Sequence, residues 1–166
     1  HFGELSGIAA SPSVFALRSV GLDVATIQAW IAQAQAENDG SLAFQHGIAN
    51  LQRLLALLLP EETALLANYP NPFNPETWIP YQIAQASDVQ IHIHAINGTL
   101  VRTLDLGHQA AGVYQQRTRA AYWDGRNQLG EPVASGVYFY TLSTESTRDS
   151  VTAGDFTATR KMLIRK

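Results

Sequence analysis

The chain has 166 residues, of which 46% are hydrophobic and 15% are charged, and this composition suits one or two small folded domains. Its formal net charge is -3 and its 11 Lys and Arg residues are spread over most of the sequence, so no nucleic-acid partner is predicted. The lack of cysteine excludes disulfides and thiol nucleophiles, and the most apolar run, Leu51–Leu59, is too short to span a bilayer.

The N-terminal residues 1–22 contain Gly, Ser and Pro without a sustained period, so we predict a linker or the tail of an upstream domain. The chain starts at His1 with neither Met nor a signal peptide. We therefore expect it to be the C-terminal part of a longer protein.

Residues 23–67 predict a helical hairpin. Asp23 and Ser41 are suited to the N-caps of two helices, and Gly40 to the left-handed position after the first helix. The leucines of the second helix form a stripe that one partner helix cannot cover, so we expect the hairpin to pack on the following region or on an upstream domain. A third short helical turn is expected at Glu61–Leu66.

The apolar period changes to two at Asn68, and the prolines that follow exclude a helix. Thr77–Ile83 predicts the first strand, in which Pro80 favours an edge position. Further strands are expected at Val89–Ile96, Thr99–Leu104, Gly112–Tyr122, Gly136–Ser143 and Phe156–Arg165. Since no helical crossover intervenes, residues 68–166 predict an immunoglobulin-like antiparallel β-sandwich. The whole chain is then mainly β, and α+β in architecture through the helical hairpin before the sandwich.

Three segments of this region carry specific expectations. Asn97-Gly98 predicts a two-residue hairpin turn with positive φ at both residues. Thr144–Gly154 is polar and weakly patterned, and we expect an extended loop there. Alternation in the last strand places Met162 and Ile164 on one face, so that this row can be buried while basic residues on the other face stay exposed.

Four ordered motifs carry a resemblance to a known family: Tyr69–Pro75 (YPNPFNP), Asn97–Leu104 (NGTLVRTL), Trp123–Tyr140 (WDGRNQLGEPVASGVYFY) and Lys161–Lys166 (KMLIRK). Together they resemble the C-terminal sorting domains of bacterial secreted proteins, the type A tails of type IX secretion. That family is related to the immunoglobulin-like domain of the flagellar hook-capping protein. The polar segment Ser143–Thr152 departs from the family pattern, in which a short turn leads from the aromatic strand into AGDF.

The resemblance implies a non-catalytic module for export, cell-surface sorting or anchoring of a larger secreted protein. It implies an extracellular or bacterial cell-surface location, with partners among secretion or anchoring proteins and upstream domains of the same polypeptide. The candidate sorting or recognition residues are Gly136, Tyr138, Arg160, Lys161, Arg165 and Lys166. The residues that the motifs mark as structural are Tyr69, Pro70, Asn71, Pro72, Asn97, Gly98, Trp123, Asp124 and Gly125.

A weaker resemblance lies at His1–Glu4 (HFGE), which is similar to the end of a dockerin. The calcium-ligand loops of that module are absent from the sequence, so no calcium site follows.

The remaining polar residues do not combine into a reactive site. His92 and His94 share a strand face, but a third metal ligand is not identifiable, so we predict no metal and no cofactor. Asp124 belongs to a run whose residues are typical of turns. Because no nucleophile or acid–base pair emerges, the sequence does not predict an enzyme.

Two alternatives remain open. The basic end of the chain can serve to protect an edge strand against unwanted pairing. The region can also act as a carbohydrate- or protein-binding β-sandwich in extracellular assembly, by strand addition at an open sheet edge. Tyr138 and Tyr140 share one strand face, where core packing is favoured over a platform for sugar rings.

Overall fold

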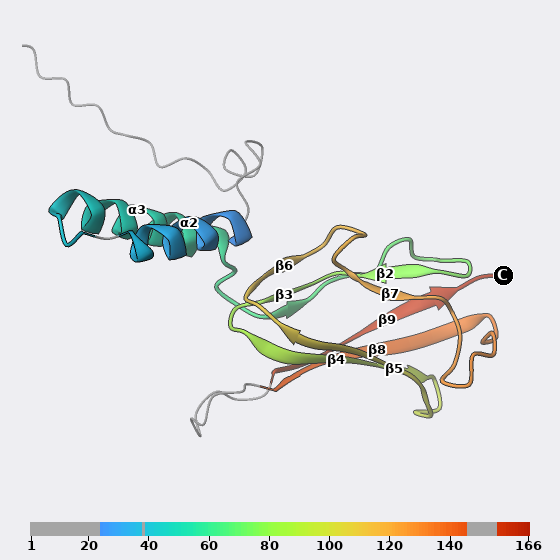
Figure 1. The fold of residues 1–166 in the computed structure, drawn as a ribbon. Helices are drawn as coiled ribbons and strands as arrows, with labels where there is room; N and C mark the ends of the chain where they lie inside the picture. The colour runs from blue at the N-terminus through green and yellow to red at the C-terminus, as the bar shows by residue number, and fades with distance from the viewer. Residues whose placement is uncertain (1–23, 38, 146–155) are drawn as a thin grey trace, which may run out of the picture. The chain divides into compact units, whose positions relative to one another are not determined.

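A computed structural model describes residues 24–37, 39–145 and 156–166 (Figure 1). The chain divides into two compact units, with the boundary between Leu58 and Leu59. The linker predicted over residues 1–22 and the dockerin-like HFGE lie outside the described residues. The loop predicted at Thr144–Gly154 lies mostly outside them, and its first two residues end a strand.

In its described residues, the first unit contains two helices, α2 (Val24–Ala36) and α3 (Leu42–Leu58), in agreement with the predicted helical hairpin. Ser41 caps α3, since its hydroxyl oxygen accepts a hydrogen bond from the Phe44 N–H at 3.4 Å. Ile27 and Leu58 are buried, and the apolar residues packed against them are Val24, Ile31, Leu51, Leu54 and Leu55.

The helical turn predicted at Glu61–Leu66 is wrong. Ala64–Leu65 form a short strand, β1, which pairs antiparallel with β3 (Tyr81–Ile83). The Leu66 N–H donates to the Pro80 carbonyl at 3.0 Å, and Leu65 is buried in the core of the second unit. Pairing and burial therefore override the local helical preference, which is weak in so short a segment. Residues 59–67, which the sequence placed with the helices, belong to the second unit.

The second unit is an immunoglobulin-like β-sandwich in which all the described strand pairs are antiparallel. One sheet has the order β5-β4-β8-β9, and the opposite layer consists of β1-β3-β6 and β2-β7 (Figure 1). The strands not yet named are β2 (Thr77–Ile79), β4 (Ser87–Ala95), β5 (Leu100–Gln109), β6 (Gly112–Tyr114), β7 (Ala121–Trp123), β8 (Gly136–Glu145) and β9 (Phe156–Ile164).

The core follows from the alternation that the sequence shows. On β4, Val89, Ile91 and Ile93 point inward and are fully buried, whereas the residues between them lie on the outer face. The same period buries alternate residues of β8 and β9, namely Tyr138, Tyr140, Leu142, Met162 and Ile164. Each fully buried aliphatic side chain stabilises the sandwich by about 1.5–3 kcal/mol relative to exposure.

Two predicted strands are each divided in the structure. Thr77–Ile83 becomes β2 and β3, separated at Pro80, which cannot donate a ladder hydrogen bond. The two halves pair with different neighbours, and the expected edge position is wrong for β3, which lies between β1 and β6. β2 pairs with β7, and its Trp78 is also bridged to Tyr69 on the other side. Gly112–Tyr122 becomes β6 and β7, because Gln116 starts a turn in which its carbonyl accepts from the Arg119 and Ala120 N–H groups.

The Asn97-Gly98 connection joins β4 to β5, as predicted, but its geometry differs from the expected two-residue turn. The Gly98 N–H donates to the Ala95 carbonyl at 2.9 Å, and Gly98 has φ of 85°. Only glycines have positive φ in the described part of the chain, so the positive φ expected for Asn97 is wrong. Instead, the Asn97 side-chain oxygen accepts from the Thr99 N–H at 3.0 Å, and residues 96–99 lie between the two strands.

Candidate functional site

The structure brings the opening motif of the sandwich against the end of its last strand. The Phe73 N–H donates to the Leu163 carbonyl and the Arg165 N–H donates to the Phe73 carbonyl, both at 3.0 Å. The Asn71 side-chain oxygen accepts from the Leu163 N–H, also at 3.0 Å. We call these four residues the terminal junction. It covers the outer edge of β9 at its C-terminal end, where the strand would otherwise be unpaired.

An aromatic cluster anchors the terminal junction in the core. The Phe73 ring is 5.6 Å from the Trp123 ring, which in turn is 5.8 Å from the Tyr138 ring, measured between centroids. The Trp123 ring N–H donates to the Arg126 carbonyl at 2.9 Å. Aromatic residues of two of the four family-like motifs, Tyr69–Pro75 and Trp123–Tyr140, therefore meet inside the sandwich.

Gly125 sits where the WDG turn passes close to another segment. Its φ is 71°, and a Cβ placed on it would lie 2.4 Å from the Pro75 carbonyl oxygen and 3.3 Å from the Ile164 side chain. Only glycine fits this approach without a backbone shift. The neighbouring Asp124 side chain accepts from the Arg126 N–H at 3.1 Å, in agreement with its interpretation as a turn residue.

The four basic residues at the end of the chain fall into two pairs. Two are attached to the fold: the Arg160 guanidinium donates to the Leu65 carbonyl at 2.8 Å, and the Lys166 ammonium donates to the Val133 carbonyl. Lys161 and Arg165 are exposed, and in the described residues no hydrogen bond or ion pair involves their side chains.

The two tyrosines of β8 are buried in the core and do not form part of the surface. Tyr138 is 8% exposed and Tyr140 is fully buried, so core packing is confirmed for both. The Tyr140 hydroxyl accepts from the Asn68 N–H at 3.0 Å and donates to the Leu66 carbonyl at 2.9 Å. Burial raises the pKa of both phenols above the ordinary value. Gly136, another candidate, starts β8 opposite Ile164.

The histidines of β4 lie on the outer face of the four-stranded sheet. The His92 and His94 rings are 6.5 Å apart, and His92 Nδ1 is 3.2 Å from the Thr103 hydroxyl. Within the described residues, no group of three His, Cys, Asp or Glu side chains is placed to hold a metal ion.

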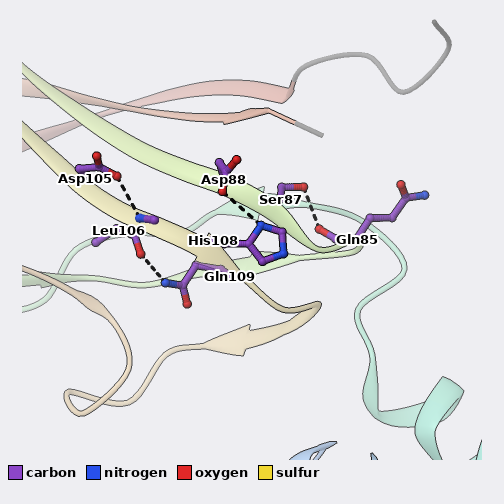
Figure 2. A network of polar contacts seen from close by, with 8 residues as sticks. Gln85, Ser87, Asp88, Asp105, Leu106, His108 and Gln109 are labelled. Carbon is purple, nitrogen blue, oxygen red and sulfur yellow. Dashed lines mark hydrogen bonds and ion pairs between the residues drawn. The ribbon is translucent and has the colours of Figure 1, made fainter. Parts of the chain in front are cut away.

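A polar network, which the sequence did not indicate, joins the far ends of β4 and β5 (Figure 2). His108 Nδ1 is 3.1 Å from the Asp88 carboxylate, and the Asp105 carboxylate accepts from the Gly107 N–H at 3.0 Å. Both members of the His108–Asp88 pair are about half exposed, so this pair contributes at most about 1 kcal/mol. We therefore interpret the His108–Asp88 pair as a contact that joins β4 and β5, and not as part of a functional site.

A second feature that sequence reasoning missed is a row of three aromatic rings on the outer face of β2 and β7. Tyr69 pairs with Trp78, and Trp78 pairs with Tyr122. The sequence alone does not indicate this row, because its three residues come from three separate segments whose pairing register only the structure gives. Hereafter we call these three residues the aromatic row.

No helix in the described residues is long and apolar enough to cross a membrane.

The fold defines the class of protein: an immunoglobulin-like β-sandwich preceded by two helices. A sequence model of the FlgD Ig-like domain matches residues 75–150, which is less than half of the chain. No curated protein matches the chain.

Several solved structures are similar to this chain. Dimeric latent PorU from Porphyromonas gingivalis is 18% identical over 60% of this chain and 9% of its own, with a TM-score of 0.46. FlgD from P. aeruginosa is 23% identical over 49% of this chain and 57% of its own, with a TM-score of 0.38. PorZ, a surface component of the type-IX secretion system of P. gingivalis, is 18% identical over 64% of this chain and 12% of its own, with a TM-score of 0.35. The chain thus spans less than two thirds of each of these proteins, and such low TM-scores carry no argument about function.

Proposed function

We propose that the β-sandwich unit is a module for export, cell-surface sorting or anchoring of a larger secreted protein. One observation supports it most: the terminal junction holds the end of β9 in a defined shape while Lys161 and Arg165 stay exposed. A sorting signal that is recognised on a folded protein needs both properties. The receptor must bind a fixed surface, and exposed charges speed the association. The resemblance of the four motifs to the sorting-domain family supports the same role.

The partners that we propose are proteins of the secretion or anchoring machinery and upstream domains of the same polypeptide. The proposed location is extracellular or on the bacterial cell surface. We assign no reaction to the module, because the polar groups of its motifs serve turns and core contacts. The Asp124 carboxylate accepts from a backbone N–H in its own turn, and the Tyr140 hydroxyl joins two buried segments.

Charge reversal at Lys161 and Arg165, both to Glu, tests the proposal. Both residues are exposed, so the free energy of unfolding should change by less than about 0.5 kcal/mol for each. Lys166 is left unchanged because its ammonium group is bonded to the Val133 carbonyl. A reporter fused upstream should then accumulate in the periplasm of a type IX-competent host, while the sandwich stays folded.

The matched control reverses the charge of Arg117 and Arg119, two exposed residues of the β6–β7 connection. This variant undergoes the same change in net charge and should still be delivered to the surface. Normal delivery of the Lys161 and Arg165 variant contradicts the proposal, as does an equal loss of delivery in the control.

A rival function is favoured by the position of β9 at the edge of the four-stranded sheet. Among the described residues, the terminal junction pairs only with the end of this strand, and backbone alternation turns the N–H and C=O groups of Thr157, Thr159 and Lys161 outward. This edge can accept a strand from a partner in extracellular assembly. Normal surface delivery of the charge-reversed protein, together with new edge-to-edge association, would favour edge protection or strand addition over sorting.

A further inference from the structure

The aromatic row is rigidly held in place. Tyr69 and Trp78 exchange two backbone hydrogen bonds of 2.9 Å, and their rings are 6.4 Å apart at an angle of 22°. The Trp78 ring is 5.6 Å from the Tyr122 ring. The Tyr122 hydroxyl donates to the Glu76 carboxylate at 2.7 Å, and the Tyr69 hydroxyl donates to the Gln115 carbonyl. Because both outer rings are fixed by hydrogen bonds, a ligand that uses this surface pays little ordering cost.

The aromatic row is also accessible. Tyr122 is 47% exposed, while Tyr69 and Trp78 are half-buried. The core does not need these rings, since the alternate residues Thr77, Ile79, Ala121 and Trp123 fill the inner face. Contacts between the rings across β2 and β7 stabilise this small sheet. Such contacts do not by themselves explain why Tyr122 is exposed.

Arg117 adds a positive charge to this surface. Its guanidinium carbon lies 4.2 Å from the centre of the Trp78 ring, which is a cation–π contact. Among the described residues, no hydrogen bond or ion pair involves this guanidinium. This contact holds the guanidinium over the ring, and its N–H groups can bind a carboxylate in a bidentate manner.

From these features we infer that the aromatic row and Arg117 form a binding site for a polysaccharide that contains uronic acids. The C–H face of a pyranose ring packs on the electron-rich face of an aromatic ring, as at the exposed Tyr122. The carboxylate of the sugar then pairs with the Arg117 guanidinium. This site is separate from the terminal junction and does not depend on the sorting role.

The shape of the site favours a sugar polymer over an acidic peptide. The three rings lie side by side on a strand surface, and Trp78 at the centre of the row is paired on both sides. A peptide that binds by strand addition needs unpaired backbone groups, so it cannot add a strand beside Trp78. Sugar rings need an exposed ring face, which Tyr122 provides, and the sugar carboxylate needs a cationic partner, which Arg117 provides.

The test measures binding of the whole chain to four polymers by affinity gel electrophoresis. Polygalacturonate and alginate supply uronic acids, fully methyl-esterified pectin supplies the same ring without charge, and poly-L-glutamate supplies carboxylates without sugar. We expect retardation by at least one of the two uronate polymers. The methyl ester should bind about tenfold more weakly, because the charge-assisted hydrogen bonds are lost, and poly-L-glutamate should not bind.

Single substitutions locate the site. Arg117→Gln should weaken uronate binding about tenfold, and so should Tyr122→Ala, which removes a stacking surface. Arg119→Gln is the matched control: it removes the same charge two residues away, from a side chain that lies over the Tyr114 ring, and should change binding less than about twofold. Arg117 is exposed, so its substitution reports on binding even if the Tyr122 variant is unstable.

Three results would overturn the inference. The first is the absence of binding to both uronate polymers. The second is equal binding to poly-L-glutamate, which would assign the surface to acidic peptides. The third is an equal effect of Arg119→Gln and Arg117→Gln, which would show that binding follows net charge rather than the aromatic row.

Discussion

Replacing Gly125 by alanine should destabilise the sandwich more than its small size suggests. Gly125 lies in the left-handed region with φ of 71°, and its added Cβ would meet the Pro75 carbonyl oxygen at 2.4 Å. That oxygen belongs to the backbone, which cannot rotate away as the end of a flexible side chain can. The two segments must therefore separate at the place where the opening motif and the WDG turn meet.

Two terms give the magnitude. An L-residue in the left-handed region costs about 1–2 kcal/mol, and forcing extra volume into a packed contact costs about 1–3 kcal/mol. Gly125→Ala should thus lower the free energy of unfolding by about 2–5 kcal/mol. Gly98→Ala is the matched control, because Gly98 has φ of 85° but no atom within 4 Å of an added Cβ. It should lose only the first term, about 1–2 kcal/mol.

Urea unfolding followed by tryptophan fluorescence measures both values. The measurement uses a background in which Trp30 of the helical unit is changed to Phe, so that only Trp78 and the buried Trp123 report. The m-value should not change, since the surface exposed on unfolding is the same. If Gly125→Ala and Gly98→Ala lose equal stability, the close approach to Pro75 does not constrain the fold and the reasoning fails.

Three further predictions concern the cores of the two units. Tyr140→Phe leaves the N–H of the buried Asn68 without its acceptor and should cost about 1–3 kcal/mol in the same urea assay; an unchanged transition would contradict this. Burial raises the pKa of Tyr81 above 10.0, so the folded state keeps a proton that the unfolded chain releases, and stability should fall as the pH rises past 10.0. Tyr81→Phe should flatten that fall, and an unaltered alkaline profile would count against it. Leu58→Ala should cost the helical unit about 2–5 kcal/mol by far-UV circular dichroism, whereas Leu57→Ala, at a position 45% exposed, should change it by less than about 0.5 kcal/mol.

The sequence predicted the long strands well because their signal is local. Alternation of apolar and polar residues determines which side chains of β4, β8 and β9 can face a core, and the structure buries those residues. The same logic failed where a strand changes partners. Pro80 interrupts an apparently continuous strand. The first half, β2, pairs with β7, and the second half, β3, pairs with β1 and β6.

Short strands and long-range contacts could not be predicted from the sequence for a different reason. Ala64–Leu65 become a strand only because β3 lies beside them, and a local helical preference gave the wrong prediction. The terminal junction joins residues 92 positions apart in the sequence, and the aromatic row needs the register of three segments. Neither feature leaves a periodic pattern. The basic residues at the end of the chain were visible in the sequence, but only the structure shows that the Arg160 and Lys166 side chains are bonded to backbone carbonyls. In the described residues, no hydrogen bond or ion pair involves the side chains of Lys161 and Arg165.

The most direct test of the sorting role is whether the sandwich unit is sufficient for delivery. A reporter with a signal peptide, fused to residues 59–166, would be produced in a type IX-competent host and in the same host without a functional type IX system. The account predicts that protease added to intact cells degrades the reporter only in the competent host, where it reaches the surface. A reporter that stays protected in the periplasm of both hosts would contradict the account.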